Sequence, residues 1–468
     1  MIKYKIGYFF LAYCLSLIFW QCTSESQNVI TYPGIPDLET SDLYEVQVNN
    51  RTVWVEKFRT SMDIENLPDW FTSESYTLEQ QEVHIANLSC KSQILVTLKV
   101  REHVKSVSIR PNSRDIKYII EGNLIRFSLP GPDHIYIEIN DLPPLCLFAN
   151  PIEDIVPDQN DENVRYFGPG VHNPGMMTLE DNEIIYIAGG AIVYGGIRAN
   201  GSSDIKVLGR GILDGGFEHK RMVVLEDAKN IEFNGILIRN GVSWTNTVIN
   251  CENVKYTGIK VISFGPGGDG INPLGSQNME ISDCFLRCTD DCIAIKSPDS
   301  SHVVKNIRVF NNTMIGYAFS DGITIGFETN GPFVEDVKVY NCDVLQARGG
   351  SRVDGHSAFS IICDGPAMIR NITFEDIRVD EDVYKLFELN ITDGTKYGIN
   401  PPGHIRDIHL KNIKWNSVQP IILKGFDETH RVQNVTFEKC TLKGEVIEEA
   451  RTDLFEINEF VDDVQFIK

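Results

Sequence analysis

The chain has 468 residues, of which 42% are hydrophobic and 10% aromatic, as in a folded globular protein with a large core. Its 43 basic and 65 acidic residues give a formal net charge of −22, which argues against a nucleic-acid partner because such proteins present a basic face. The same charge disfavours a strongly anionic substrate unless a local basic pocket overrides it.

The first residues predict an export signal. Lys3 and Lys5 precede an apolar run over residues 6–20, which is short for a membrane span and gives way at once to polar residues. Residues 1–21 resemble a bacterial lipoprotein signal whose removal leaves an acylated Cys22 as the mature N-terminus. The bulky residues just before Cys22 depart from that pattern, so plain secretion is the alternative. We expect an exported protein, in the bacterial periplasm or at the cell surface, that contacts the membrane only through such a lipid.

Residues 30–150 alternate polar and apolar side chains in short runs, such as T-V-W-V at 52–55 and Q-I-L-V-T-L-K-V at 93–100. Runs of period two that are separated by turn residues predict antiparallel strands with one solvated face. About seven such strands fit a small β-sandwich. A proline-rich stretch over residues 141–157 is interpreted as the linker that follows it.

From about residue 160 onward, one ten-residue pattern recurs. It has apolar residues at its third, fifth, eighth and tenth places and usually Asn or Asp at its second. Its eight copies begin at residues 229, 252, 277, 305, 335, 370, 406 and 433. A repeat built only of short β-runs, with loops of variable length between them, is typical of a solenoid. We therefore predict a right-handed parallel β-helix over residues 160–468, with coils about 4.8 Å apart.

Three of the eleven cysteines, Cys284, Cys342 and Cys440, occupy the eighth place of the repeat, where other copies carry mostly Ile. This position predicts buried core thiols, not disulfides or nucleophiles. The chain has no C-x-x-C pair and no His/Cys cluster with zinc spacing, so we predict no metal site and no other cofactor.

Three aspartates stand out in G-G-D-G-I-N-P at 267–273 and C-T-D-D-C-I-A-I-K at 288–296. Asp269 lies 21 and 22 residues before Asp290 and Asp291, close to the length of one coil, so stacking brings their carboxylates side by side. Repulsion lets one carboxyl keep its proton while the others stay ionised and bind water, as glycoside hydrolysis requires. Solvated turn aspartates and a calcium site are the alternatives.

These stretches, with S-D-G-I-T-I-G-F-E at 320–328, resemble glycoside hydrolase family 28, the polygalacturonase family. That family has N-T-D-G-I, D-D-C-I-A-I and G-H-G-x-x-I-G in the same order and with nearly the same spacing, and R-N-G-V-S-W at 239–244 also resembles it. The resemblance covers roughly residues 160–440. A β-sandwich ahead of the β-helix is similar to family 49, the dextranases and isopullulanases, which share the three-aspartate arrangement.

The resemblance implies a role for each aspartate. Asp290 matches the proton donor, while Asp269 and Asp291 match the pair that positions the attacking water in an inverting hydrolase of α-glycosidic bonds. Neighbouring strand residues point to opposite faces, so Asp290 and Asp291 reach one cleft only if the backbone bends there.

Two departures from family 28 bear on the substrate. Asp321 stands where the family has histidine, and the family's R-I-K triplet, which grips a uronate carboxylate, is missing from its expected place near residues 355–361. Arg348, Arg352 and His356 lie nearby as partial replacements. We expect little turnover of plain homogalacturonan and better activity on a neutral or mixed poly- or oligosaccharide.

Three further residues are candidates for substrate binding. Lys296 follows the aspartate pair and either faces the cleft or lies on a solvated face. Glu328 matches a glutamate of exo-acting family members and is otherwise a turn residue. Trp244 is either a stacking platform for a sugar ring or a core residue.

Two other functions compete with hydrolysis. A β-helical polysaccharide lyase needs calcium or a basic residue to remove a proton, and the sequence shows no Lys/Arg cluster near the aspartates. A non-catalytic glycan-binding adhesin would have no use for a water-holding aspartate set.

Overall fold

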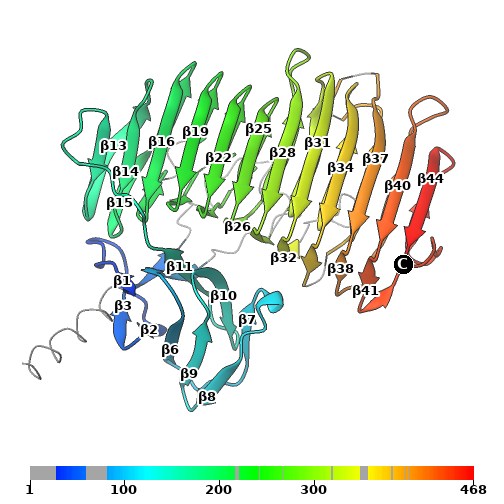
Figure 1. Cartoon of the computed structure of the whole chain (residues 1–468). Helices are drawn as coiled ribbons and strands as arrows, with labels where there is room; N and C mark the ends of the chain where they lie inside the picture. Colours follow the sequence, from blue (N-terminus) through cyan, green and yellow to red (C-terminus); the bar gives the residue numbers. More distant parts are fainter. Residues whose placement is uncertain are drawn as a thin grey trace, which may run out of the picture.

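The structure is a computed structural model that describes residues 28–59, 82–216, 221–241, 243–265, 267–317, 320–347, 357–380, 383–395, 397–399 and 401–468. Regular structure in these residues is β, apart from one short 3₁₀ helix, η3 (Asn112–Arg114). A small sandwich packs beside a long parallel β-helix, which confirms the predicted fold class (Figure 1). In the described part of the chain, no helix has the length and apolarity needed to cross a membrane. Cys22 and the predicted signal lie outside the described residues.

The N-terminal domain has eleven described strands, more than the seven expected, because short edge strands carry too few residues to show an alternation. One sheet contains β1 (Val29–Thr31), β4 (Val55–Arg59), β5 (Glu82–Cys90), β7 (Val107–Arg110), β10 (Asp133–Ile139) and β11 (Leu145–Pro151). The other contains β2 (Tyr44–Val48), β3 (Arg51–Val53), β6 (Ile94–Val100), β8 (Tyr118–Glu121) and β9 (Leu124–Leu129). Their inner faces share one apolar core.

The repeat identified in the sequence forms a twelve-stranded parallel sheet along one side of the β-helix (Figure 1). Its strands are β12 (Val164–Phe167), β14 (Ile184–Ile187), β16 (Ser203–Gly209), β19 (Lys229–Asn234), β22 (Glu252–Thr257), β25 (Gln277–Ser282), β28 (Val304–Phe310), β31 (Phe333–Tyr340), β34 (Met368–Glu375), β37 (His404–Lys411), β40 (Val432–Glu438) and β44 (Val461–Ile467). The eight aligned copies correspond to β19 through β40, so the sequence repeat missed only the outer coils.

The remaining strands form a 21-stranded sheet with two rows. The row facing the sandwich contains β13 (Gly170–Thr178), β15 (Ala191–Asn200), β17 (Ile212–Asp214), β20 (Leu237–Arg239), β23 (Lys260–Ile262), β26 (Phe285–Cys288), β29 (Thr313–Gly316), β32 (Asp343–Ala347), β35 (Arg378–Val379), β38 (Lys414–Trp415), β41 (Thr441–Leu442) and β42 (Glu445–Val446). The other row contains β18 (Val223–Glu226), β21 (Asn246–Ile249), β24 (Ile271–Leu274), β27 (Ile293–Ser297), β30 (Ile323–Thr329), β33 (Phe359–Cys363), β36 (Phe387–Ile391), β39 (Ile421–Lys424) and β43 (Phe455–Ile457).

The ten-residue repeat spans a corner of the coil, not a single strand. In the first copy, Ile231 and Phe233 point inward from β19, Ile236 lies at the corner, and Ile238 belongs to β20. All four side chains are in one continuous apolar core, at most 2% exposed. The cysteines of the eighth place, Cys284, Cys342 and Cys440, are free and buried in the same core, as predicted.

The second place of every copy has a left-handed backbone, which explains its preference for Asn and Asp. The φ angles there lie between 53 and 58°, a region that these two side chains tolerate better than most residues. The side chains also bond along the stack, as from Asn253 to Asn230 at 3.1 Å and from Asn306 to Asn278 at 2.8 Å. Local backbone preference thus sets the register of the coils.

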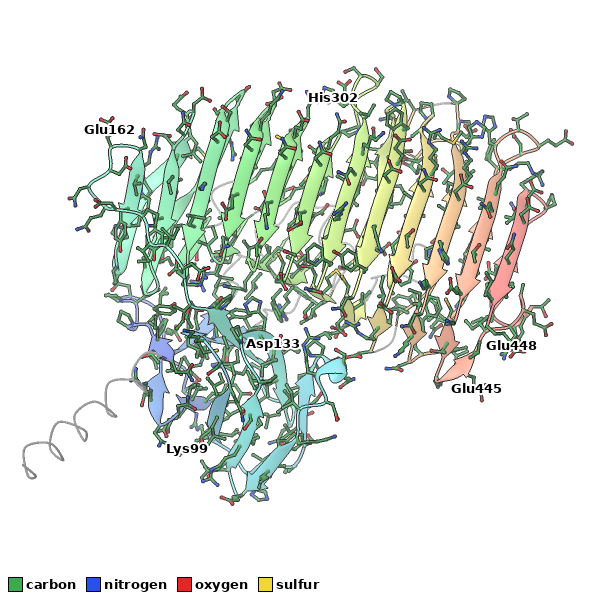
Figure 2. All side chains as sticks on the ribbon, viewed as in Figure 1. Lys99, Asp133, Glu162, His302, Glu445 and Glu448 are labelled. Atoms are coloured by element: carbon green, nitrogen blue, oxygen red, sulfur yellow. The ribbon has the colours of Figure 1, made fainter. Side chains whose placement is uncertain are left out.

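The sandwich is fixed to the β-helix by a mixed apolar and ionic interface. Phe148 and Ile85 pack against outward side chains of the strand row that faces them, including Phe285. Buried Arg239 bonds Asp214 at 2.7 Å within the β-helix and Glu56 of the sandwich at 2.8 Å. Figure 2 shows side chains filling this junction, with Asp133 beside it.

Candidate active site

Three aspartates occupy the same place on three successive coils. Asp269, Asp291 and Asp321 each lie two residues before a strand, and the first residues of those strands, in β24, β27 and β30, pair in register. The main-chain ladder runs through the same point, since Gly270 N–H donates to the Asp291 carbonyl at 2.9 Å and Cys292 N–H to the Asp321 carbonyl at 3.0 Å. Stacking places these side chains one coil apart, about 4.8 Å.

Asp290 joins this group because the backbone bends there. Asp290 and Asp291 lie between β26 and β27, outside any strand, so the alternation of strand side chains does not apply to them. The Asp291 N–H donates to Asp290 Oδ1 at 3.0 Å. The charge of Asp290 acts on both Asp269 and Asp291, so the three carboxyls form one electrostatic group.

Burial and mutual repulsion control the ionisation of this group. Asp269 and Asp291 are 2% and 7% exposed. Burial, and then the charge of Asp290, raise the pKa of both carboxyls well above its usual range. Lys296 lowers both pKa values, and Asn272 donates to Asp269 Oδ2 at 2.6 Å. The ionisation of each of these carboxyls therefore depends on the charge of the others.

Lys296 faces the same side of the sheet and is paired. Its Nζ donates to Glu328 Oε2 at 2.8 Å, and the lysine is only 6% exposed. Burial opposes its charge, but Asp269, Glu328 and Asp291 outweigh burial and raise the pKa of Lys296. The ammonium is therefore a fixed positive charge beside the aspartates.

A bulge in β30 brings Glu328 to Lys296. Ile295 pairs with Ile325 and Ser297 with Thr329, so Lys296 alone faces the three residues 326–328. Gly326 has a φ of 106°, and a Cβ there would lie 2.1 Å from the Ile362 carbonyl oxygen. The glycine is required for this close approach.

Asp321 is held by donors from two coils. It accepts hydrogen bonds from Thr324 Oγ1 at 2.7 Å, from the Ser357 N–H at 2.7 Å and from the Ser360 hydroxyl. Its own N–H donates to Asp291 Oδ1 at 2.9 Å. After burial and the charge of Asp290, the charge of Asp321 also raises the pKa of Asp291. The serines and Thr324 were missed in the sequence because only the register shows that they meet Asp321.

Trp244 occupies the coil before Asp269 in the same row of positions. Its ring is half-buried and belongs to none of the apolar cores of the described residues. The Lys296 Nζ lies 4.7 Å from the ring centroid and the Arg221 Cζ lies 4.6 Å from it. Trp244 thus lines the aspartate face, whereas Arg348, Arg352 and His356 lie outside the described residues.

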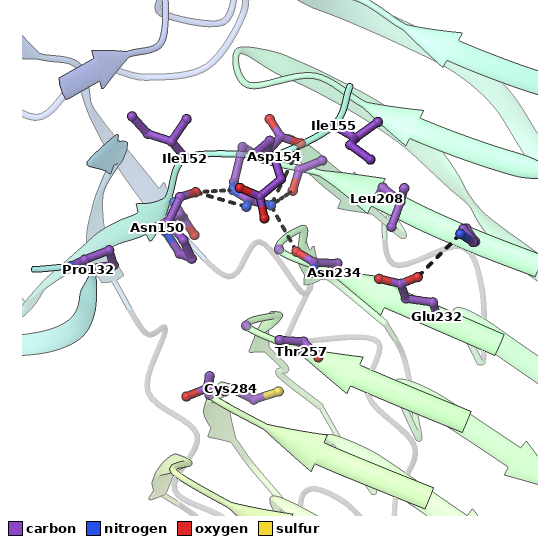
Figure 3. A pocket seen from close by; sticks show the side chains of 18 of the residues that line it. Pro132, Asn150, Ile152, Asp154, Ile155, Leu208, Glu232, Asn234, Thr257 and Cys284 are labelled. Carbon is purple, nitrogen blue, oxygen red and sulfur yellow. Dashed lines mark hydrogen bonds and ion pairs between the residues drawn. The ribbon is translucent and has the colours of Figure 1, made fainter. Parts of the chain in front are cut away.

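A cavity of about 890 Å³ lies elsewhere, between the linker after the sandwich and the β-helix (Figure 3). Its lining includes Asn150, Glu232 and Asn234 but none of the aspartates above. Arg210 crosses it to the Pro151 carbonyl at 3.0 Å and to Asn234 Oδ1 at 3.3 Å. These contacts tie the linker to the β-helix, and the candidate site remains the aspartate face.

A family model, Glycosyl hydrolases family 28, matches residues 176–453, more than half of the chain. Polygalacturonase QRT2 of Arabidopsis thaliana is 27% identical over 209 residues, which cover 43% of this chain and 45% of that protein. A probable exopolygalacturonase B of Aspergillus flavus is 24% identical over 210 residues, or 38% of this chain and 46% of that protein. The matches thus span about half the length of these curated relatives.

Solved structures extend the likeness to both domains. Dex49A from Penicillium minioluteum matches 93% of this chain and 96% of its own, with a TM-score of 0.66 at 16% identity. An exopolygalacturonase from Thermotoga maritima matches 65% of this chain and 84% of its own, with a TM-score of 0.54 at 17% identity. The first match covers the sandwich as well, as the layout similar to family 49 implied. By its family model and its β-helix, the chain belongs to the glycosyl hydrolases of family 28.

Proposed function

We propose that this protein is an inverting glycoside hydrolase that cleaves α-glycosidic bonds in a poly- or oligosaccharide. The observation that carries the proposal is the stacking of Asp269 and Asp291 on successive coils, with Asp290 in the bend between them. Asp290 donates the proton to the leaving oxygen, and Asp269 and Asp291 orient the attacking water. An inverting enzyme keeps its acid and base about 6.5–9.5 Å apart to admit that water.

The environment of Lys296 supports this division of roles. Burial and the charge of Asp290 raise the pKa of Asp269 and Asp291, and the positive charge of Lys296 partly opposes this rise. The raised pKa of Lys296 also makes it a poor base at neutral pH, which counts against a lyase that would use this lysine to remove a proton. A glycan-binding adhesin has no need of buried carboxyls with raised pKa values, because burial and mutual repulsion oppose the ionisation of each carboxyl.

The sugar at the aspartates is proposed to be neutral. A uronate held there needs a cationic partner, because a buried unpaired carboxylate costs several kcal/mol. Asp321 supplies a further negative charge where the family has histidine, and Lys296 is already bound to Glu328. Neutral hydroxyls, in contrast, donate well to carboxylate acceptors.

A polysaccharide panel with reducing-end detection tests the activity. We expect release of reducing ends from a neutral or mixed α-linked glycan and little or none from unsubstituted homogalacturonan. Proton NMR of the first product is expected to show inversion at the anomeric carbon. Retention contradicts the water-mediated scheme, an unsaturated product absorbing in the ultraviolet indicates a lyase, and efficient release of galacturonic acid refutes the neutral sugar.

Replacing Asp321 by Asn is expected to move the acid limb of the kcat/KM profile to lower pH. After burial and Asp290, Asp321 is the next contributor that raises the pKa of Asp291. Removing its charge lowers that pKa, so the ionised form of Asp291 persists to lower pH. Asp336→Asn is the control, because it removes an exposed carboxylate on the twelve-stranded sheet at a φ of 58° that Asn accepts. An acid limb that stays in place in Asp321→Asn contradicts this electrostatic role.

We also propose that the protein acts outside the cytoplasm, anchored by a lipid on Cys22. The apolar run over residues 6–20 supports export, and a carbohydrate polymer is too large to enter a cell intact. Metabolic labelling with a fatty acid, compared between the native chain and Cys22→Ala, distinguishes an anchored protein from a freely secreted one.

A further inference from the structure

Two arginines lie on the face that carries the aspartates, toward its N-terminal end. Val223, Asn246 and Ile271 pair in register, so Arg221, Trp244 and Asp269 occupy one row on three successive coils. Arg198 lies one coil earlier and pairs with Val224, in the neighbouring outward row. The sequence shows no basic cluster here, because these arginines come together only when β15 and β18 stack.

The Arg198 guanidinium contacts the main chain of Arg221, and neither arginine holds a carboxylate in the described part of the chain. Arg198 donates only to main-chain oxygens, those of Ile197 at 2.9 Å, Met222 at 3.3 Å and Arg221 at 2.7 Å. Arg221 makes a cation–π contact with Trp244 and, among the described residues, no hydrogen bond or ion pair. Burial and the charge of Arg221 lower the pKa of Arg198.

Several other arginines do hold carboxylates, as expected in a chain with 65 acidic and 43 basic residues. Arg239 bonds Asp214 at 2.7 Å and Arg378 bonds Asp343 at 2.6 Å. Two adjacent cations repel each other, and an anion that bridges them removes this repulsion. A guanidinium presents its donors in a planar fork that matches a carboxylate or sulfate.

We propose that Arg198 and Arg221 form a subsite for an anionic substituent of the glycan, a carboxylate or a sulfate ester. Arg221 lies two coils and Arg198 three coils from Asp269, about 10 and about 14 Å along the β-helix, so the bound glycan is acidic there and neutral at the aspartates. Trp244 lies between the two regions in register and contacts Arg221. The assignment rests on the proposed function, because it takes the aspartate face as the glycan cleft.

Calorimetric titration of the full chain carrying Asp290→Asn, which is expected to slow turnover, tests the subsite. The probes are a hexasaccharide of alternating galacturonic acid and rhamnose, its carboxyl-reduced counterpart, and a sulfated neutral hexasaccharide. We expect at least one charged probe to bind about tenfold to a hundredfold more tightly than the reduced probe. This difference in affinity is expected to shrink as salt is added, because salt screens the charges. Comparing the affinity for the galacturonic acid probe with that for the sulfated probe shows whether the subsite prefers a carboxylate or a sulfate.

Adding Arg221→Gln is expected to abolish the preference for the charged probe over the reduced probe. Arg198→Gln is the second variant, with thermal melting to confirm folding because its guanidinium bonds three carbonyls. Arg308→Gln is the matched control, since it removes one exposed positive charge from β28 on another sheet. The control is expected to keep the preference.

Equal affinity for charged and reduced probes, or an equal loss in Arg308→Gln, overturns the subsite and leaves Arg221 as a packing partner of Trp244. Hydrolysis by the native chain is measured separately on the polysaccharide panel. Charge-selective binding without hydrolysis refutes the proposed function and keeps the subsite. Hydrolysis with charge-independent binding refutes the subsite and keeps the proposed function.

Discussion

Replacing Asp290 by Asn is expected to slow hydrolysis of a glycan with a poor leaving group by about 100- to 10,000-fold. Asn cannot donate the proton that the departing oxygen needs, so bond cleavage loses its general acid. A substrate whose leaving group is a stable phenolate needs little protonation and is expected to lose much less. This contrast between substrates separates a missing acid from a damaged site.

The same substitution is expected to leave stability unchanged or to raise it. The charge of Asp290 raises the pKa of both Asp269 and Asp291, so its removal relieves a repulsion in the folded protein. An Asn side chain retains the oxygen that accepts the Asp291 N–H at 3.0 Å, so the bend keeps its hydrogen bond. Thermal melting measures this effect, with Asp336→Asn as a charge-matched control. Unchanged hydrolysis of the poor-leaving-group substrate would show that Asp290 is not the acid.

The coil register could be predicted from the sequence because one local preference recurs. Asn and Asp tolerate a left-handed backbone, and eight such residues mark the same turn on successive coils. The spacing of 22 residues between Asp269 and Asp291 then equals one coil, and the two residues align as predicted. Cys284 and its equivalents follow the same register into the core.

The partners of the aspartates could not be predicted, because they depend on loops of unequal length. Ser360 lies 39 residues after Asp321, many more than the 22 that separate Asp269 from Asp291, so spacing alone does not align them. Arg198 and Arg221 were missed for a related reason: no repeat copy covers their strands. Counting back two residues from the start of each strand of this row identifies Arg221, Trp244 and Asp269 together.

The bulge at Glu328 depends on an interaction that leaves only a weak signal in the sequence. Gly326 permits it, yet a glycine inside a strand has several explanations, and Lys296 lies 32 residues from its partner Glu328. The pairing follows only once Ile295 and Ile325 are aligned. The bulge could therefore not be predicted from the sequence, because the contact between coils that explains it required the structure.

Replacing Ile372 by Asp is expected to unfold the coils around it. Ile372 is fully buried and lies in register between Val337 and Ile408, so a carboxylate there finds only apolar neighbours. Burying an unpaired charge costs on the order of 5 kcal/mol, comparable with the whole stability of a typical domain. Ile231→Asp, in the first copy, is expected to act in the same way.

Thr373 is the matched control for Ile372, because it is the next residue on the same strand and lies half-buried on the outer face, in register between Lys338 and His409. We expect Thr373→Asp to change the free energy of unfolding by about 0.5 kcal/mol or less. Urea unfolding followed by circular dichroism measures both variants. In a solenoid each coil is stabilised mainly by its neighbours, so the loss is expected to begin around β34 and to spread along the stack. Equal tolerance of Asp at residues 372 and 373 would mean that the inward and outward positions are wrongly assigned, and the alignment of Asp269 with Asp291 depends on the same register.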